Sequence, residues 1–319
     1  MITCSVIIRT LNEEEHLARL LIGLEQQYHP PREIIVVDSG SEDATLAIAE
    51  AFGVRILSIP QLDFSFGRAL NLGFNAMTSE VGVAMSAHVY PVKRTHLTEL
   101  LRPFEDPSVG IAFGRQVGDE RSHFSEKRLM LKWFPPDGSG TQTIPFSNNA
   151  NAATRAEAWN QLQFDEDLTG LEDVEFCQRA MMRGWKVYYV AEAPVVHVHQ
   201  ENWNKIRNRY RRETRTLVHL DPNQNLSLPH AFGLSAINIW LDSVSAFREK
   251  SVSRDLTSIL KFRTAQFLGV WEGGHLDKEL SGEMKRRMFF PPSSRFKNSV
   301  STDSDTIEYA EVARHATMD

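Results

Sequence analysis

Short apolar runs alternate with helix-like segments over about the first ninety residues, and each run ends at a polar residue or a proline. The runs SVIIRT, EIIVVD, VRILSIP and VGVAMSAH end at Thr10, Asp38, Pro60 and His88. This alternation predicts a mostly parallel sheet with helices on both faces. Ligands of such open sheets bind beside the carboxyl ends of the strands. We therefore expect Thr10, Asp38, Ser86 and His88 to gather along one edge of the sheet and to form the active site.

Apolar residues at helical spacing predict a helix after most of these strands. Asn12 is the expected N-cap of the first helix, which opens with three glutamates, and Ser41 is expected to open the second. The predicted elements of this half are helices over 13–27, 41–52, 66–77 and 95–102 and a fifth strand over 109–114.

The segment 115–151 loses this periodicity and is rich in Gly, Pro, Ser and Asn, which predicts a long loop. Because it contains Trp133, Phe134 and Phe146, which are residue types that disordered segments lack, we expect it to face the substrate. Beyond it the pattern predicts helices near 155–159 and over 172–183, and strands over 185–190 and 194–200.

A change of character after His199 predicts a separate C-terminal region. We expect a sheet domain over 1–200, a helical extension over 201–289 and a partly disordered tail over 290–319. The extension opens with a basic helical stretch that carries Lys205, Arg207, Arg209, Arg211, Arg212 and Arg215. Two interpretations stay open: a solvated helix packed on the sheet domain, or contact with an anionic lipid layer or a charged glycan.

Composition narrows the class of protein. With 42% hydrophobic and 24% charged residues the 319-residue chain is typical of a globular protein, and its net charge of -6 gives no reason to expect a nucleic-acid partner. Cys4 and Cys177 are the only cysteines, and we expect both to be buried, reduced thiols. No apolar run approaches the roughly 18 residues of a membrane span, and a strand begins almost at once. A cytoplasmic protein is expected.

Two strand ends carry side chains suited to binding a nucleotide or an ion. Asp38 begins the sequence DSGSED, where a carboxylate can accept hydrogen bonds from a base or a ribose, although an ordinary helix start through Ser41 explains it as well. Ser86 and His88 lie on the same side of the chain because side chains alternate along a strand. His88 is suited to a divalent cation or a phosphate, and a single structural hydrogen bond is the alternative.

Three further groups are candidates for chemistry, each with an ordinary structural alternative. Glu172 and Asp173 open a helix after a glycine, which suits either a general base or a favourable first turn. His197 and His199 share one strand face, as a metal or phosphate site or as a solvated pair. A separate pair, Arg68 and Asn71, lies on one helix face, either toward a phosphate or toward solvent.

Taken in order, the motifs resemble those of the family 2 glycosyltransferases with the GT-A fold. The resemblance covers about residues 3–200 and is carried by SVIIRTLNEE, EIIVVDSGSEDAT, FGRALNLG, VAMSAHVYP, NANAATRAEAW, GLEDVEF and VVHVHQ. It implies a Rossmann-like α/β domain, here followed by a helical extension. It also implies transfer of a sugar from a nucleotide-diphosphate donor to an acceptor hydroxyl, with inversion, in glycan or polysaccharide synthesis.

The resemblance also implies roles for individual residues. The positions matching nucleotide-binding residues are Thr10, Glu13, Asp38, Arg68, Asn71 and Ser86, and those matching the sugar and acceptor pocket are Asn149, Asn151 and Arg155. Asp173 matches the catalytic base, with Glu172 beside it. His88 and one of His197 and His199 match ligands of Mg2+ or Mn2+. The chain departs from the family here, because Ser-Ala-His replaces Asp-X-Asp.

The family also implies partners, and a UDP-sugar is the expected donor. The acceptor is expected to be a glycan, a lipid-linked glycan or another hydroxyl compound, with peripheral contact at the inner face of a membrane as a further expectation. A nucleotidyltransferase is disfavoured because RTLNEEE after the first strand is acidic rather than glycine-rich and basic. The missing Asp-X-Asp motivates one alternative, a non-catalytic nucleotide-sugar-binding partner subunit, and Glu172 and Asp173 argue against it.

Overall fold

A mixed, largely parallel sheet forms the centre of the protein in a computed structural model that describes residues 2–199, 201–275, 307 and 309. Within these residues the strand order is β3-β2-β1-β4-β8-β6-β9-β5, with β7 pairing to β9. The strands are β1 Cys4–Thr10, β2 Glu33–Asp38, β3 Arg55–Ser58, β4 Val81–Ser86, β5 Val89–Pro91, β6 Val109–Val117, β7 Gly140–Thr141, β8 Asn151–Arg155 and β9 Lys186–His197. The four strands β1 to β4 are parallel, and β6 and β9 run in the same direction because β8 lies antiparallel between β4 and β6.

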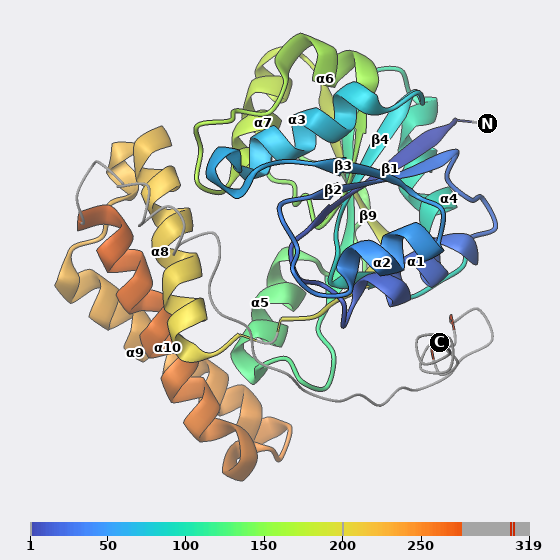
Figure 1. The fold of residues 1–319 in the computed structure, drawn as a ribbon. Coiled ribbons are helices and arrows are strands. Elements are labelled where there is room, and N and C mark those ends of the chain that lie inside the picture. The colour runs from blue at the N-terminus through green and yellow to red at the C-terminus, as the bar shows by residue number, and fades with distance from the viewer. Residues whose placement is uncertain (1, 200, 276–306, 308, 310–319) are drawn as a thin grey trace.

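Helices cover both faces of this sheet, which confirms the predicted α/β class (Figure 1). The helices are α1 Leu17–Glu25, α2 Thr45–Ala51, α3 Phe66–Ala76, α4 His96–Leu101, α5 Phe124–Trp133, α6 Ala156–Leu162, α7 Glu172–Met182, α8 Trp203–Leu220, α9 Leu228–Arg248 and α10 Val252–His275. Alternation along β1 sends Val6 and Ile8 to the core under α1, α2 and α4, and Ile7 to the core under α3, α6 and α7. Gly73 lets α3 approach Ile7, which a Cβ at that position would strike.

Four expectations about local structure were wrong. Ser41 does not open the second helix, since α2 begins at Thr45 and the Ser41 hydroxyl donates to Asp38. Asn12 has a left-handed backbone and does not cap α1; its side-chain oxygen instead accepts a hydrogen bond from the Glu42 amide, 2.8 Å away, which ties two loops together. The segment 115–151 contains α5 and β7 and is not one continuous loop. The two strands expected over 185–200 are one, β9, because a register shift against β6 accommodates Pro194, which has no amide to donate.

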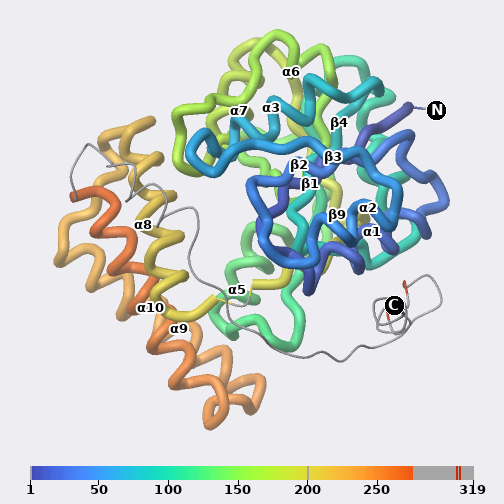
Figure 2. The backbone as a smooth tube through the Cα atoms, viewed as in Figure 1, coloured from blue at the N-terminus to red at the C-terminus, as the bar shows by residue number. Residues whose placement is uncertain are grey.

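A helical unit of α8, α9 and α10 stands beside the sheet domain, as Figures 1 and 2 show. Gly269 and Gly273 of α10 bring its backbone against that of α8, where a Cβ would strike the carbonyl oxygens of Arg207 and Arg211. The part of the expected helical extension beyond residue 275 and most of the expected tail lie outside the described residues. Two tail residues are described, Ile307 and Tyr309, and both are buried; Tyr309 donates a 2.7 Å hydrogen bond to the Pro91 carbonyl. Among the described residues, the helices are too short or too polar to cross a membrane.

Candidate active site

The carboxyl ends of the central strands bring the predicted residues together. Thr10 is level with Asp38 across β1 and β2, and Arg9 is level with Ser86 across β1 and β4. The chain after β9 joins the same edge, because the Val198 amide donates to the His88 carbonyl over 3.0 Å. The predicted clustering at one sheet edge is therefore confirmed.

Asp38 organises the loop that follows β2. Its carboxylate accepts hydrogen bonds from the hydroxyls of Thr10 (3.2 Å) and Ser41 (2.5 Å) and from the amides of Gly40 (2.9 Å) and Ser41 (3.0 Å). Gly40 has a φ of +92°, which a residue with a side chain rarely adopts, so the tight turn depends on this glycine. The buried carboxylate thus shapes the loop, and its contact with a nucleoside stays a prediction.

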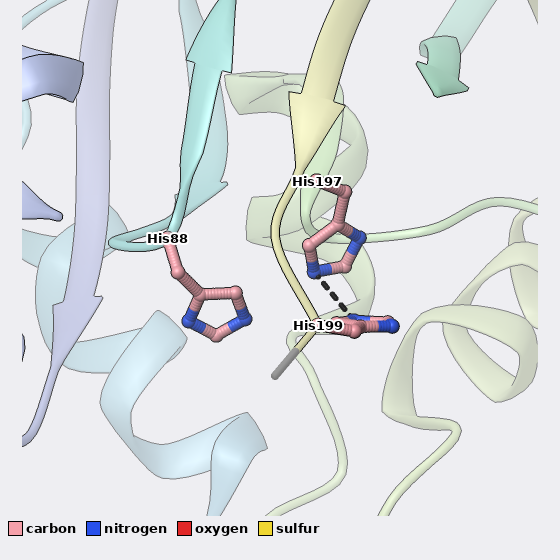
Figure 3. Close-up of side chains that lie close together, drawn as sticks. All are labelled: His88, His197 and His199. Carbon is pink, nitrogen blue, oxygen red and sulfur yellow. Dashed lines mark hydrogen bonds between the residues drawn. The ribbon is translucent and has the colours of Figure 1, made fainter. Parts of the chain in front are cut away.

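Three histidines converge at the same edge of the sheet (Figure 3). His88 follows β4, His197 is the last residue of β9, and His199 lies two residues beyond it. One ring nitrogen of each lies within 4.8 Å of those of the others. The His88 and His197 rings stack with centroids 5.1 Å apart, and the Nε2 atoms of His197 and His199 are 2.9 Å apart.

The remaining ring nitrogens are held by oxygen atoms. The Nδ1 atoms of His88, His197 and His199 lie 2.8, 2.7 and 2.7 Å from Glu13 Oε1, Gln116 Oε1 and Glu126 Oε1. A protonated Nδ1 that donates to oxygen leaves Nε2 with a lone pair, which is the usual arrangement of metal-binding histidines.

The facing Nε2 atoms of His197 and His199 fit a bound cation. Two bare lone pairs at 2.9 Å repel, and either a proton shared by the two nitrogens or a metal ion bound by both relieves this repulsion. Burial, and then the charges of His199 and His88, lower the pKa of His197 well below its ordinary value, which keeps this ring neutral and able to ligate. Burial opposes protonation of His88 too, but the Glu13 carboxylate raises the pKa of His88 above its ordinary value.

Asp173 lies at the start of α7 against the same edge. Its carboxylate accepts hydrogen bonds from the amides of Asn149 (3.1 Å) and Val174 (2.8 Å), while Glu172 pairs with Arg9 at 3.2 Å. Burial and then the charge of Glu172 raise the pKa of Asp173 to about 7. A carboxylate with a pKa near neutrality is suited to accept a proton from a substrate.

Helix α8 supplies residues that the sequence gave no reason to assign to the site. Arg209 pairs with Glu126 (2.8 Å) and Glu201 (2.7 Å), so it holds the carboxylate that orients His199. Gln116, Glu126 and Glu201 were missed because they belong to no recognisable motif. His199 also belongs with Glu126 and Glu201 to a second group of closely spaced potential ligands.

The basic stretch in α8 is largely committed to partners inside the protein. Arg207 forms an ion pair with Glu272, Arg209 pairs as described, and Arg212 lies over the Phe66 ring at 5.0 Å. These contacts favour the interpretation of a helix packed on the protein over that of a basic surface facing lipid.

Asn71 was expected to face the diphosphate, and that prediction was wrong. Its amide nitrogen donates to Phe164 O (2.9 Å) and Glu166 Oε1 (3.0 Å), and its oxygen accepts from Trp159 Nε1 (3.0 Å) and Phe164 N (2.9 Å). This uses the whole hydrogen-bonding capacity of a buried amide. Arg68 pairs with the same Glu166 at 2.7 Å, remains partly exposed, and its contact with phosphate stays a prediction.

Arg155 was expected in the sugar pocket and lies instead at the opposite end of β8. It is level with Val81, the first residue of β4, and its guanidinium donates to the carbonyls of Phe104, Asp106 and Val109. Asn151 is level with Met85 at the correct edge, but it is fully buried and donates to the carbonyls of Arg115 and Ala193. A role for Asn149 and Asn151 toward the sugar stays a prediction.

Comparison with known proteins identifies the class. Residues 5–163 match the model of glycosyl transferase family 2, and residues 92–241 match that of glycosyl transferase family group 2. The chain belongs to glycosyltransferase family 2.

Two curated relatives are O-antigen chain rhamnosyltransferases by name. The O-antigen chain rhamnosyltransferase RfbN of Salmonella typhimurium is 27% identical over 208 residues, which is 61% of this chain and 66% of that protein. The O-antigen chain rhamnosyltransferase WbaN of Salmonella anatum is 26% identical over 189 residues, 56% of this chain and 60% of the other. The chain therefore spans a little under two thirds of the length of these relatives.

Solved structures share the fold at low sequence identity. The mannosyltransferase PcManGT from Pyrobaculum calidifontis, in complex with GDP-Man and Mn2+, has a TM-score of 0.61 and 17% identity, over 87% of this chain and 88% of that one. S. aureus TarS 1–349 has a TM-score of 0.52 and 15% identity, over 86% and 90%. The GT-A-like α/β fold with a helical C-terminal region is confirmed.

Proposed function

We propose that this protein transfers a sugar from a nucleotide-diphosphate sugar to an acceptor hydroxyl, with inversion, during the synthesis of a polysaccharide. A rhamnosyl donor is the first candidate, because two curated relatives are O-antigen chain rhamnosyltransferases. The observation that carries the proposal is Asp173, a buried carboxylate with a raised pKa at the edge of the sheet where the three histidines also meet.

Asp173 is the proposed general base. One carboxylate oxygen takes the proton of the acceptor hydroxyl while that hydroxyl oxygen attacks the anomeric carbon of the donor. The bond from that carbon to the nucleoside diphosphate breaks on the opposite side, so the configuration inverts and the electron pair leaves with the phosphate. The amides of Asn149 and Val174 fix the carboxylate, and Arg9 holds the neighbouring Glu172.

The Nε2 atoms of His88, His197 and His199 would hold a Mg2+ or Mn2+ ion. Such an ion would stabilise negative charge on the departing diphosphate. Support comes from the convergent ring nitrogens and from their oxygen partners on Nδ1, and PcManGT was solved with Mn2+. The loops of Thr10, Asp38 and Ser86 are proposed to receive the nucleotide.

A donor screen by thermal unfolding tests the proposal. UDP-, GDP- and dTDP-sugars are added to the full-length protein with and without Mn2+, since a ligand that binds the native state raises its stability. We expect one nucleotide class to protect the wild type and the Asp173→Asn variant equally, with sugar transfer seen only for the wild type. Protection without transfer to any hydroxyl acceptor would favour the alternative of a binding subunit, and the absence of protection by every donor would refute the proposal.

A further inference from the structure

Helix α9 exposes apolar residues and buries small or polar ones, which is the reverse of an ordinary surface helix. Its buried residues are small or polar: Ala231, Ser235, Asp242 and Ala246. Most of its large apolar residues are exposed instead, although Ile239 and Val244 are partly buried. The exposed ones are Leu228, Phe232, Leu234, Ile237, Trp240, Leu241 and Phe247. Phe232 and Phe247 are each 76% exposed and Trp240 is 65% exposed. A surface helix normally places its apolar residues against the core, so this face requires an explanation.

The inward face of α9 shows that this orientation is firmly fixed. Asp242 is buried and receives hydrogen bonds from Arg128 of α5 (2.8 Å) and from Arg263 of α10 (2.7 Å). Rotating the helix to bury its apolar side would break both charged contacts and leave buried charges unpaired, which is costly. The apolar side is therefore presented outward by the packing.

Exposed apolar residues also occur on the two helices that pack beside α9. Leu256 and Leu260 of α10, one helical turn apart, are exposed, as is Leu131 of α5, which packs beside α9. We call the exposed apolar residues of α9 together with these three leucines the α9 patch.

Basic residues accompany the α9 patch. The exposed basic residues of α5, α9, α10 and the α9–α10 connection are Lys127, Lys132, Arg248, Lys250, Arg254 and Lys261. Over the same described elements, Glu249 is the exposed acidic residue, and Asp255 is mostly buried and paired with Arg254. This surface is therefore basic although the whole chain has a net charge of -6.

We propose that the α9 patch docks on a lipid bilayer with anionic headgroups, with α9 lying in the plane of the membrane surface. An apolar helix face flanked by basic residues binds such a surface through both buried area and charge. A second copy of the chain fits less well, because two basic surfaces would face each other across the interface. The purpose of this docking rests on the proposed function, because docking would bring the site to an acceptor carried on a membrane lipid. The docking itself does not depend on that function.

Vesicle flotation tests the docking without donor or acceptor, so its result is independent of sugar transfer. We expect the full-length protein to float with vesicles of phosphatidylcholine and phosphatidylglycerol, and about tenfold less with phosphatidylcholine alone or in high salt. The double variant Trp240→Ser/Phe247→Ser should lose about tenfold in partitioning. The pair Arg248→Glu/Lys250→Glu should lose binding to the anionic vesicles.

The matched control is Leu62→Ser, since Leu62 is 88% exposed on the sheet domain, away from α9. It should float like the wild type, and all variants should keep the wild-type unfolding temperature. Failure of the wild type to float would overturn the proposal, as would equal flotation of the Trp240→Ser/Phe247→Ser variant. A dimer in sedimentation that this variant dissociates, without any vesicle binding, would assign the patch to a second copy.

Discussion

At alkaline pH, Asp173→Asn should lower the activity of the protein and raise its stability. The pKa of Asp173 is raised from 3.8 to about 7 by burial and by Glu172, so the folded protein holds a proton that the unfolded chain loses. Between these values the native state binds more protons than the unfolded state, and stability therefore falls as the pH rises. Above about pH 7 the cost of keeping the ionised carboxylate buried is fully present.

The size of this cost follows from the pKa difference. At about 1.4 kcal/mol per pKa unit, ionised Asp173 destabilises the fold by about 4 kcal/mol above neutrality. Asparagine carries no charge, but it has one oxygen for two amide donors, Asn149 and Val174, and so loses about 1 kcal/mol at every pH. From about pH 5 to about pH 8, the stability of Asp173→Asn relative to the wild type should rise by about 3 kcal/mol.

Thermal unfolding of both proteins from about pH 5 to about pH 8 measures the effect. At about 2 °C per kcal/mol, the unfolding temperature of the variant relative to the wild type should rise by about 6 °C over this range. Turnover of Asp173→Asn should fall at least about 10²-fold, and wild-type turnover should decline below about pH 7 as the base becomes protonated. The exposed Asp167 provides the control Asp167→Asn, which should change neither quantity. A stability difference that does not change with pH would refute the burial argument, and near-wild-type turnover would remove Asp173 from the mechanism.

Four other substitutions test three separate parts of the structure. His199→Ala should weaken Mn2+ binding in a calorimetric titration, and Glu126→Gln should weaken it about tenfold because the His199 ring is then less firmly held. If EDTA leaves the activity unchanged, the histidines would instead donate hydrogen bonds to phosphate. Asn71→Ala should lower the free energy of unfolding by about 2–4 kcal/mol, measured in denaturant, since it leaves the indole and main-chain groups unpaired. Arg155→Met should cost about 1–3 kcal/mol while kcat per folded molecule stays at the wild-type value, and a selective loss of kcat would restore Arg155 to the site.

The sheet edge could be predicted from the sequence because strand ends are local features. Apolar runs that stop at Thr10, Asp38 and His88 indicate the carboxyl ends of three strands, although the third strand ends two residues earlier, at Ser86. Parallel pairing then brings these strand ends level. Helix α5 was missed because its surroundings are rich in glycine and proline and its exposed side carries Leu131 and Trp133, which hides the helical pattern.

The site was predicted as far as its residues lie in recognisable motifs. The three histidines were predicted from their motifs. Gln116 and Glu126 come from a strand and a helix with no motif, and only the fold brings them to the histidine rings. The spacing of Arg68 and Asn71 predicted that they share one helix face, and both do contact one group there. That group is the carboxylate of Glu166 in the same chain, which a pattern of sequence spacing cannot distinguish from a phosphate.

The contact between Arg209 and Glu126 has a consequence for how the chain can be divided. Arg209 belongs to the helical unit, Glu126 to the sheet domain, and Glu126 orients His199 over 2.7 Å. Removing residues 201–319 would leave a buried carboxylate without its guanidinium and a histidine at a free chain end. The helical unit therefore supports the histidine cluster. We expect the affinity of the cluster for a cation and the packing of α8 on the sheet domain to be coupled, so that a change that weakens one also weakens the other.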